Sequence, residues 1–157
     1  MTGITLDDIV FPAVVSLLAG FQLGTFAKAV GGLRKKYNIK PPAVTGAAEF
    51  ERGLRAQQNA IEFTPLFLII LWISAIFFHP VVASVSGLVY LFGRNRYFKG
   101  YLKSADGRLA PFEIIEAGLH LLLFQSIIGI TQCLLLKYAG FNLKETVCSY
   151  VPFKSPF

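Results

Sequence analysis

The chain is organised around a charged and amide-rich stretch, Glu49-Phe50-Glu51-Arg52-Gly53-Leu54-Arg55-Ala56-Gln57-Gln58-Asn59-Ala60-Ile61-Glu62. This stretch runs directly into an apolar block that extends from Phe63 to Phe78. Four polar residues recur at i, i+3, i+7 and i+10 and therefore share one face of a helix: Arg52, Arg55, Asn59 and Glu62. A polar stripe that continues into a membrane-grade segment is energetically expensive unless a polar group occupies it. The stretch therefore predicts a helix that enters a membrane and carries a polar binding site at one end.

The composition also indicates a membrane protein. Of the 157 residues, 54% are hydrophobic and 15% are charged, and a soluble domain of this length needs less apolar surface. Four blocks are candidates for membrane spans: Ile9–Val30, Phe63–Phe78, Val81–Phe92 and Phe112–Leu136. A span needs about 20 residues, so the second and third blocks require the amphipathic segments beside them. We therefore predict an all-α fold, an integral membrane bundle of four transmembrane helices.

The predicted bundle forms a single domain over residues 1–157. Its helices are expected at about 8–32, 48–78, 81–103 and 110–138, with a loose C-terminal tail at 139–157. Asp7 and Asp8 precede the first block, where a signal peptide carries basic residues, so this block is interpreted as a retained helix. The two cysteines, Cys133 and Cys148, fit neither a disulfide framework nor a metal-ligand spacing. We expect no metal and no nucleic-acid partner.

A second polar stripe lies in the third predicted helix. His79-Pro80 leaves only a short turn before this helix, which makes it an antiparallel neighbour of the second. Towards its far end, four residues recur at i, i+4, i+7 and i+11 and share one face: Tyr90, Arg94, Tyr97 and Tyr101. The two stripes are therefore predicted to converge at the same end of the bundle.

Basic residues predict the orientation in the membrane. The loops after the first and third helices, with the helix ends beside them, hold most of the cations: Lys28, Arg34, Lys35, Lys36, Lys40, Arg52, Arg55, Arg94, Arg96, Lys99, Lys103 and Arg108. Only Lys137, Lys144 and Lys154 remain for the opposite side. Because such residues accumulate on the cytoplasmic face, both stripes are expected there and both termini on the lumenal side.

The mixture of residues in the two stripes indicates the chemistry of a ligand. Contact with lipid head groups explains exposed cations such as Lys99 and Lys103, but Asn59 and Glu62 gain nothing from anionic lipid. Arginine forks match carboxylates, and Glu62 can accept a hydrogen bond from an amine. Glutathione, which has two carboxylates, one amine and one thiol, fits this description.

Two sets of short motifs resemble one protein family. The first set is Pro41-Pro42-Ala43-Val44-Thr45-Gly46, Phe50-Glu51-Arg52, Arg55-Ala56-Gln57-Gln58-Asn59 and Glu62-Phe63. The second set is Tyr90-Leu91-Phe92, Arg96-Tyr97-Phe98, Gly100-Tyr101 and Arg108-Leu109-Ala110-Pro111. Over about residues 10–138 the chain resembles the membrane-associated eicosanoid and glutathione metabolism (MAPEG) family, in particular its glutathione transferases and its leukotriene-forming synthases. The resemblance implies a four-helix membrane protein that assembles as a homotrimer with active sites between subunits.

The resemblance also implies roles for individual residues. One subunit would hold glutathione, the co-substrate, through Arg55, Asn59, Glu62, Tyr97 and Tyr101. The neighbouring subunit would contribute Arg34, Gln57 and Arg108. Arg108 would be the catalytic residue, because a cation beside a thiol with a pKa near ~8.5 favours the thiolate.

The implied reaction joins glutathione to a lipophilic electrophile. Leukotriene A₄ is the leading candidate, which would give a leukotriene-forming (lyase) activity, and glutathione-dependent reduction of lipid hydroperoxides stays open. The implied location is the endoplasmic reticulum or nuclear envelope, with the membrane-embedded active site facing the cytosol.

Some residues depart from the pattern of the leukotriene-forming members. Phe63, Lys35 and His120 stand where those members have tyrosine, arginine and tryptophan, which weakens the prediction of strict leukotriene specificity. We interpret His120 as a hydrogen-bonded histidine within the bundle, and Glu113 and Glu116 as interhelical partners of basic residues.

An alternative is a non-enzymatic lipid-binding partner of the five-lipoxygenase-activating type, whose tail is similar in length to this one. The arginines corresponding to Arg55 and Arg108 are missing from that type. Since this chain has both, the enzyme is the favoured hypothesis.

Overall fold

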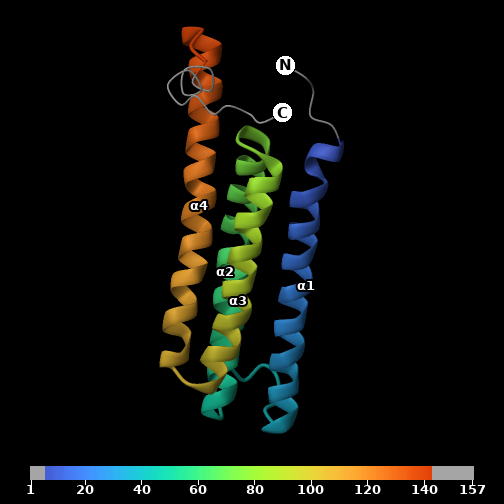
Figure 1. The fold of residues 1–157 in the computed structure, drawn as a ribbon. Helices are drawn as coiled ribbons and strands as arrows, with labels where there is room; N and C mark the ends of the chain where they lie inside the picture. The colour runs from blue at the N-terminus through green and yellow to red at the C-terminus, as the bar shows by residue number, and fades with distance from the viewer. Residues whose placement is uncertain (1–5, 143–157) are drawn as a thin grey trace, which may run out of the picture.

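The computed structural model describes residues 6–142, which form an elongated bundle of long helices that run side by side (Figure 1). The helices are α1 (Leu6–Lys36), α2 (Ala48–Phe77), α3 (Pro80–Lys103) and α4 (Leu109–Leu134). A 3₁₀ turn at Asp106–Arg108 precedes α4, and a π-helical turn at Leu135–Ala139 follows it. The predicted all-helical class is confirmed over these residues. Most of the predicted tail at 139–157 lies outside the described residues.

The helix ends differ from the prediction mainly in α1. This helix continues through Gly31 and Gly32 to Lys36, about four residues beyond the predicted end. Its last turn carries three cations, which suit the negative end of the helix dipole: Arg34, Lys35 and Lys36. Asn38, with φ of 53°, then reverses the chain. At the other end of the bundle, Gly140 closes the last turn after α4 in the left-handed conformation, with φ of 64°.

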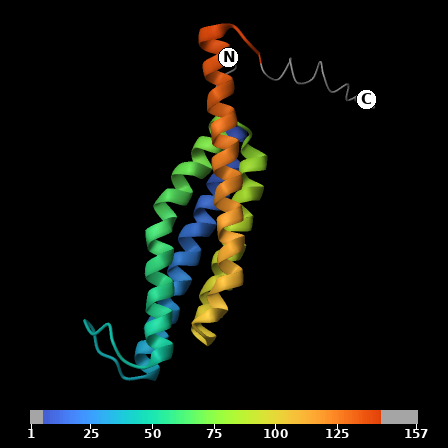
Figure 2. The same cartoon turned by 90° about the vertical axis from the view of Figure 1, so that its left-hand side faces the viewer.

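The turn between α2 and α3 is as short as predicted. The Nδ1 atom of His79 accepts a hydrogen bond from the backbone amide of Val81 at 3.2 Å, and Pro80 begins α3 where its missing amide costs nothing. The loops after α1 and α3 lie together at the opposite end of the molecule, as Figures 1 and 2 show. Both polar stripes therefore end at the same side of the bundle, as predicted.

Glycines allow α3 and α4 to approach closely. A Cβ atom at Gly93 would lie 2.9 Å from the backbone nitrogen of Ile115, and one at Gly118 would lie 2.9 Å from that of Tyr90. Small residues at such contacts let helices pack through their backbones, where lipid provides no hydrophobic driving force. This contact holds the tyrosine face of α3 against the start of α4.

Buried polar side chains connect three of the helices. Ser74 of α2 donates to Gln125 Oε1 of α4 at 2.7 Å, and Gln125 Nε2 donates to Ser86 of α3 at 2.8 Å. Each such interhelical bond contributes on the order of 0.6 kcal/mol in membrane proteins, so the network sets register as well as stability. α1 is joined to α2 by the indole nitrogen of Trp72, which donates to Ser16 at 3.1 Å.

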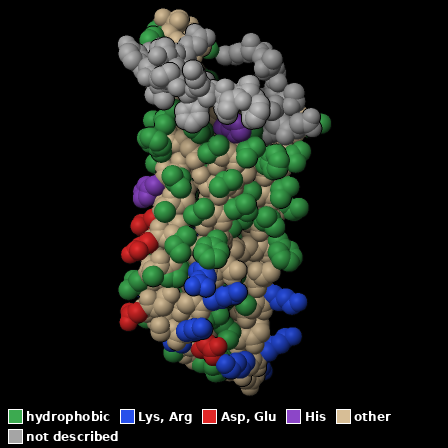
Figure 3. Space-filling view, in the orientation of Figure 1, with side chains coloured by type: hydrophobic (Ala, Val, Ile, Leu, Met, Phe, Trp, Pro, Cys, Tyr) green, Lys and Arg blue, Asp and Glu red, His purple; other side chains and the backbone are tan. Residues whose placement is uncertain are grey.

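Three segments of the described chain are long and apolar enough to cross a membrane: Ile9–Lys36, Ala48–Phe77 and Asp106–Ala139. At most 28% of their most apolar windows is buried inside the chain, so this surface faces outward. α3 is more polar because four cations lie in its second half: Arg94, Arg96, Lys99 and Lys103. In Figure 3 hydrophobic side chains cover the middle of the visible face, and Lys and Arg gather at its lower end. The multi-pass class is thus supported, while a fourth span remains a prediction.

Candidate functional site

A buried arginine lies where the two polar stripes meet. Arg94 of α3 is only 2% exposed. Its Nε donates to the Tyr90 hydroxyl at 2.9 Å, and its Nη1 donates to Asn59 Oδ1 of α2 at 2.6 Å. Its guanidinium lies 4.8 Å from the centroid of the Phe63 ring. Nη2 is also buried and has no hydrogen-bond partner among the described residues.

Burying an arginine is expensive unless its donors are satisfied. No carboxylate of residues 6–142 forms an ion pair with Arg94. The unused Nη2 donor is therefore an unsatisfied buried group, and a carboxylate or carbonyl oxygen from outside the chain would satisfy it once neighbouring side chains move to admit the ligand.

Arg94 was not among the predicted site residues, although its spacing with Tyr90 and Tyr97 was apparent in the sequence. The sequence has several arginines at this end of the bundle, and it does not indicate which of them becomes buried where α2 and α3 pack together. Its position between Tyr90 and Tyr97, each one helical turn away, was the available signal.

A second cluster contains the predicted catalytic residue. Arg108 Nη1 donates to the Tyr101 hydroxyl at 2.9 Å, and its guanidinium lies 4.8 Å from the centroid of the Tyr101 ring. Tyr101 contacts Tyr97 edge to face, with ring centroids 5.8 Å apart. Tyr97, Arg108, Leu109 and Phe112 line a pocket of about 250 Å³. Three predicted site residues therefore come together within one chain.

The position of Arg108 depends on a close approach between α3 and the turn that follows it. A Cβ atom at Gly100 would overlap the carbonyl oxygen of Gly107, so only glycine fits at this contact. The residues that follow these glycines are Tyr101 and Arg108, which are thereby held side by side. Arg108 also occupies the N-cap position of α4 without a side-chain capping bond, and the positive end of this helix adds to the attraction for an anion.

The polar residues of α2 make different contacts. Arg52 donates through Nη2 to the backbone carbonyl of Leu102 at 3.0 Å and so ties α2 to α3. Arg55 is exposed and donates to Gln58 Oε1 at 3.1 Å. Gln57 is half-buried and Glu62 is exposed, and neither side chain has a hydrogen-bond partner in the described part of the chain.

Arg34 lies away from both clusters. Its Nη1 donates to the backbone carbonyl of Ala43 at 2.7 Å, and its guanidinium lies 4.7 Å from the centroid of the Phe50 ring. These contacts fix Arg34 against the loop after α1. An ion pair of 2.6 Å between Lys36 and Glu49 also joins the end of α1 to the start of α2. The family resemblance implies that Arg34, Gln57 and Arg108 come together from one neighbouring subunit, whereas Arg108 contacts Tyr101 of its own chain.

Three polar residues of α4 lie in different surroundings from those expected. Glu113, Glu116 and His120 are spaced i, i+3 and i+7, and all three are exposed on the outer face of the helix. None of them has a hydrogen bond or ion pair with another described residue. The interpretation of His120 as a hydrogen-bonded histidine within the bundle was therefore wrong, because this face of α4 turns away from α2 and α3. For the same reason the two glutamates have no interhelical partner within the described part of their own chain.

The fold and the site together define a multi-pass membrane protein with a cluster of arginines and tyrosines at one end of its helices. The sequence model of the MAPEG family matches residues 12–128, and the chain belongs to this family.

Individual relatives are similar over most of the chain. Human (Homo sapiens) microsomal glutathione S-transferase 2 is 44% identical over 133 residues, which cover 85% of this chain and 90% of that protein. Bovine (Bos taurus) leukotriene C4 synthase is 44% identical over 124 residues, covering 79% of this chain and 83% of that protein. Leukotriene C4 synthase of Mus musculus is 40% identical over 124 residues, covering the same 79% and 83%.

Proposed function

We propose that this protein is a membrane glutathione transferase that joins the thiolate of glutathione to a lipophilic electrophile. One observation carries the proposal: Arg108, positioned by Tyr101 at the N-terminus of α4, lines a pocket with Tyr97 and Phe112. A cation there can stabilise a thiolate, and the apolar wall can accept a hydrophobic reactant. The names of the similar proteins refer to glutathione and to leukotriene C4, which supports the same chemistry.

Glutathione fits the donors and acceptors of the two polar stripes. Its carboxylates match Arg55, which is exposed, and the unused Nη2 donor of Arg94. Asn59, whose amide oxygen is taken by Arg94, is left with its NH₂ group free to donate. Glu62 is exposed and can accept from the ammonium group. Tyr97 and Tyr101 would border the cysteine portion of the ligand, next to Arg108.

The proposed chemistry is nucleophilic addition by sulfur. A thiol with a pKa near ~8.5 is mostly protonated at neutral pH, and the charge of Arg108 with the helix dipole of α4 lowers that pKa. The thiol proton leaves to solvent, a sulfur–carbon bond forms, and the carbon–oxygen bond of an epoxide breaks. The epoxide oxygen then takes up a proton, so no additional oxidant or reductant is required.

The electrophile is proposed to be a lipid that arrives through the membrane. Leukotriene A₄, an epoxide, is the leading candidate, and lipid hydroperoxides are a second class that glutathione could reduce. Large apolar side chains of α4 are exposed above the pocket, among them Leu121 and Phe124 at 47% and 63%. Such a surface can guide an apolar chain towards Arg108 without passage through water.

The complete site is proposed to form between subunits of a homotrimer. Arg34 and Gln57 do not contact the Arg108 cluster of their own chain, which supports a contribution to a neighbour's site. Exposed Glu113 and Glu116 on a helix that spans a membrane are costly in lipid, and a second subunit would cover them.

All four helices are proposed to cross the endoplasmic reticulum or nuclear envelope membrane, with the basic end in the cytosol. Protease added to sealed microsomes should then cut the loop around Lys40 and spare Lys154. Preferential cleavage near Lys154 would reverse the proposed orientation.

Turnover with glutathione tests the proposed function. The purified protein is assayed with leukotriene A₄, with a lipid hydroperoxide and with a generic aryl halide, and product formation is followed for each. Conjugation that requires glutathione, and is lost in Arg108→Ala, supports a transferase. Binding of lipid without turnover of any of the three would instead favour the non-enzymatic lipid-binding alternative.

A further inference from the structure

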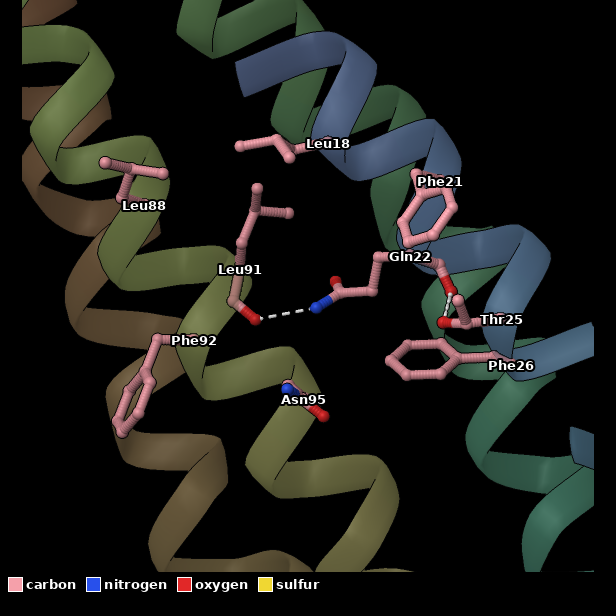
Figure 4. A pocket seen from close by; sticks show the side chains of 9 residues that line it. All are labelled: Leu18, Phe21, Gln22, Thr25, Phe26, Leu88, Leu91, Phe92 and Asn95. Atoms are coloured by element: carbon pink, nitrogen blue, oxygen red, sulfur yellow. Dashed lines mark hydrogen bonds between the residues drawn. The ribbon is translucent and has the colours of Figure 1, made fainter. Parts of the chain in front are cut away.

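An open groove separates α1 from α3 on the outside of the bundle (Figure 4). It has a volume of about 420 Å³. Its apolar walls are formed by Leu18 and Phe21 of α1 and by Leu88 and Phe92 of α3, and Phe21 and Phe92 are 72% and 57% exposed. None of the residues assigned to the glutathione site lines it, so the groove is a separate feature of the molecule.

One end of the groove is polar. Gln22 Nε2 donates across it to the backbone carbonyl of Leu91 at 2.9 Å, and Thr25 donates to the carbonyl of Gln22 at 2.7 Å (Figure 4). Asn95 is exposed beside them and has no side-chain hydrogen bond to any residue that the structure describes. Both donors of the Asn95 amide are therefore available to an oxygen-rich ligand.

Cations surround this polar end. The Arg96 guanidinium lies 5.9 Å from the centroid of the Phe92 ring, which lines the groove. Lys99 follows Asn95 by one turn of α3, and Lys28 follows Thr25 by one turn of α1. All three cations are exposed, and no described carboxylate pairs with them. The polar end of the groove therefore attracts an anion.

The depth of the polar end matches the boundary of a bilayer. Asn95 lies eight residues before the end of α3 at Lys103, which corresponds to about 12 Å along the helix. Its neighbour Arg94 bonds to Asn59 on the polar half of α2, so Asn95 is level with charged rather than apolar segments. The apolar walls continue from there towards the membrane centre.

We propose that this groove binds an anionic membrane phospholipid, with one acyl chain between α1 and α3 and the phosphate at Asn95, Arg96 and Lys99. The charge favours an anionic head group over a zwitterionic one. One acyl chain needs less room than a helix of a second copy, which with its side chains is about 10 Å wide. The bound lipid would seal α1 against α3, where Gln22 supplies a polar tie.

Native mass spectrometry of the full-length protein in a non-ionic detergent tests this proposal. Phosphatidylglycerol and phosphatidylcholine with identical acyl chains are added separately, and glycerol phosphate serves as the head group without a chain. We expect preferential retention of phosphatidylglycerol and no retention of glycerol phosphate. Lys99→Gln should weaken retention about fivefold, since one cation near an anionic lipid has that effect.

Variants that fill the groove distinguish the contribution of its shape to lipid binding from the contribution of the nearby cations. Thr25→Trp and Leu88→Trp place a large ring in the groove from opposite walls and leave all cations in place, so both should lose the bound lipid. Lys137→Gln, which removes an exposed cation from the segment after α4, is the matched control and should retain it. Circular dichroism checks that each variant keeps its helices.

Two results would overturn the proposal. One is a failure of either comparison: equal retention of both phospholipids would mean that head-group charge does not select the lipid, and undiminished retention in the folded tryptophan variants would mean that the groove does not hold it. The other is a change in the number of chains per complex in the groove variants, which would assign the groove to a contact between subunits.

Discussion

Replacing Arg94 with methionine tests whether the buried guanidinium belongs to the glutathione site. The change removes two hydrogen bonds, to Tyr90 at 2.9 Å and to Asn59 at 2.6 Å, together with the unused Nη2 donor. Hydrogen bonds of a charged group contribute about 1.5–3 kcal/mol each. Removing the buried charge also removes its desolvation cost of several kcal/mol, so the net loss of stability should be only about 2 kcal/mol.

Glutathione binding should suffer more than stability does. Arg94→Met removes one donor to a carboxylate and frees the Asn59 amide to rotate. The loss of one charged hydrogen bond, about 1.5–3 kcal/mol, corresponds to an affinity about 10- to 150-fold weaker. Calorimetric titration of the detergent-solubilised protein measures this affinity, and a thermal unfolding scan measures the stability.

The matched control is Arg96→Met, which removes an exposed arginine two residues away on the same helix. Its glutathione affinity should stay within twofold of that of the unaltered protein. If Arg94→Met is folded and also binds glutathione within twofold of the unaltered protein, the reasoning from the unpaired Nη2 atom is refuted and Arg94 serves only to join α3 to α2.

Three further predictions concern the proposed glutathione site. Arg108→Ala should leave glutathione affinity largely intact but lower the turnover rate near neutral pH by about 10²–10³-fold, with partial recovery as rising pH generates thiolate. A profile of rate against pH, with parallel affinity measurements, checks this. If affinity collapses while the thiolate fraction of bound glutathione is unchanged, Arg108 binds glutathione but does not activate its sulfur. Glu62→Gln should weaken glutathione binding by about 1–3 kcal/mol, because a bond to an ammonium becomes neutral or is lost, and unchanged calorimetric affinity would remove Glu62 from the site. Gly100→Ala should reduce turnover strongly, because the added methyl group pushes Gly107 and the following Arg108 out of position. Gly24→Ala is the control and should leave turnover unchanged, since a Cβ atom there has nothing within 4 Å. Equal turnover in both variants would show that the close approach of Gly100 to Gly107 does not position Arg108.

The long helices and the basic end of the bundle could be read from the sequence. Apolar blocks of sufficient length, a turn as short as His79-Pro80 and the asymmetry of Lys and Arg are local properties, and local properties determine helices, connections and charge distribution. Spacing also placed Asn59 and Arg94 correctly on the faces of their helices. The one clear error in helix length, at Gly31 and Gly32, arose because isolated glycines lower helix stability without ending a helix.

Only the tertiary structure decided what each charged residue contacts. Arg52 and Arg55 share one stripe, yet Arg52 binds the carbonyl of Leu102 on α3 while Arg55 remains exposed. Likewise, His120 recurs at a helical spacing with Glu113 and Glu116, as Arg94 does with Tyr90 and Tyr97. His120 nevertheless points out of the bundle, whereas Arg94 points into it. Helical periodicity determines the angles between side chains on one helix, whereas the rotation of that helix towards its neighbours depends on where glycines and polar bonds let the helices touch.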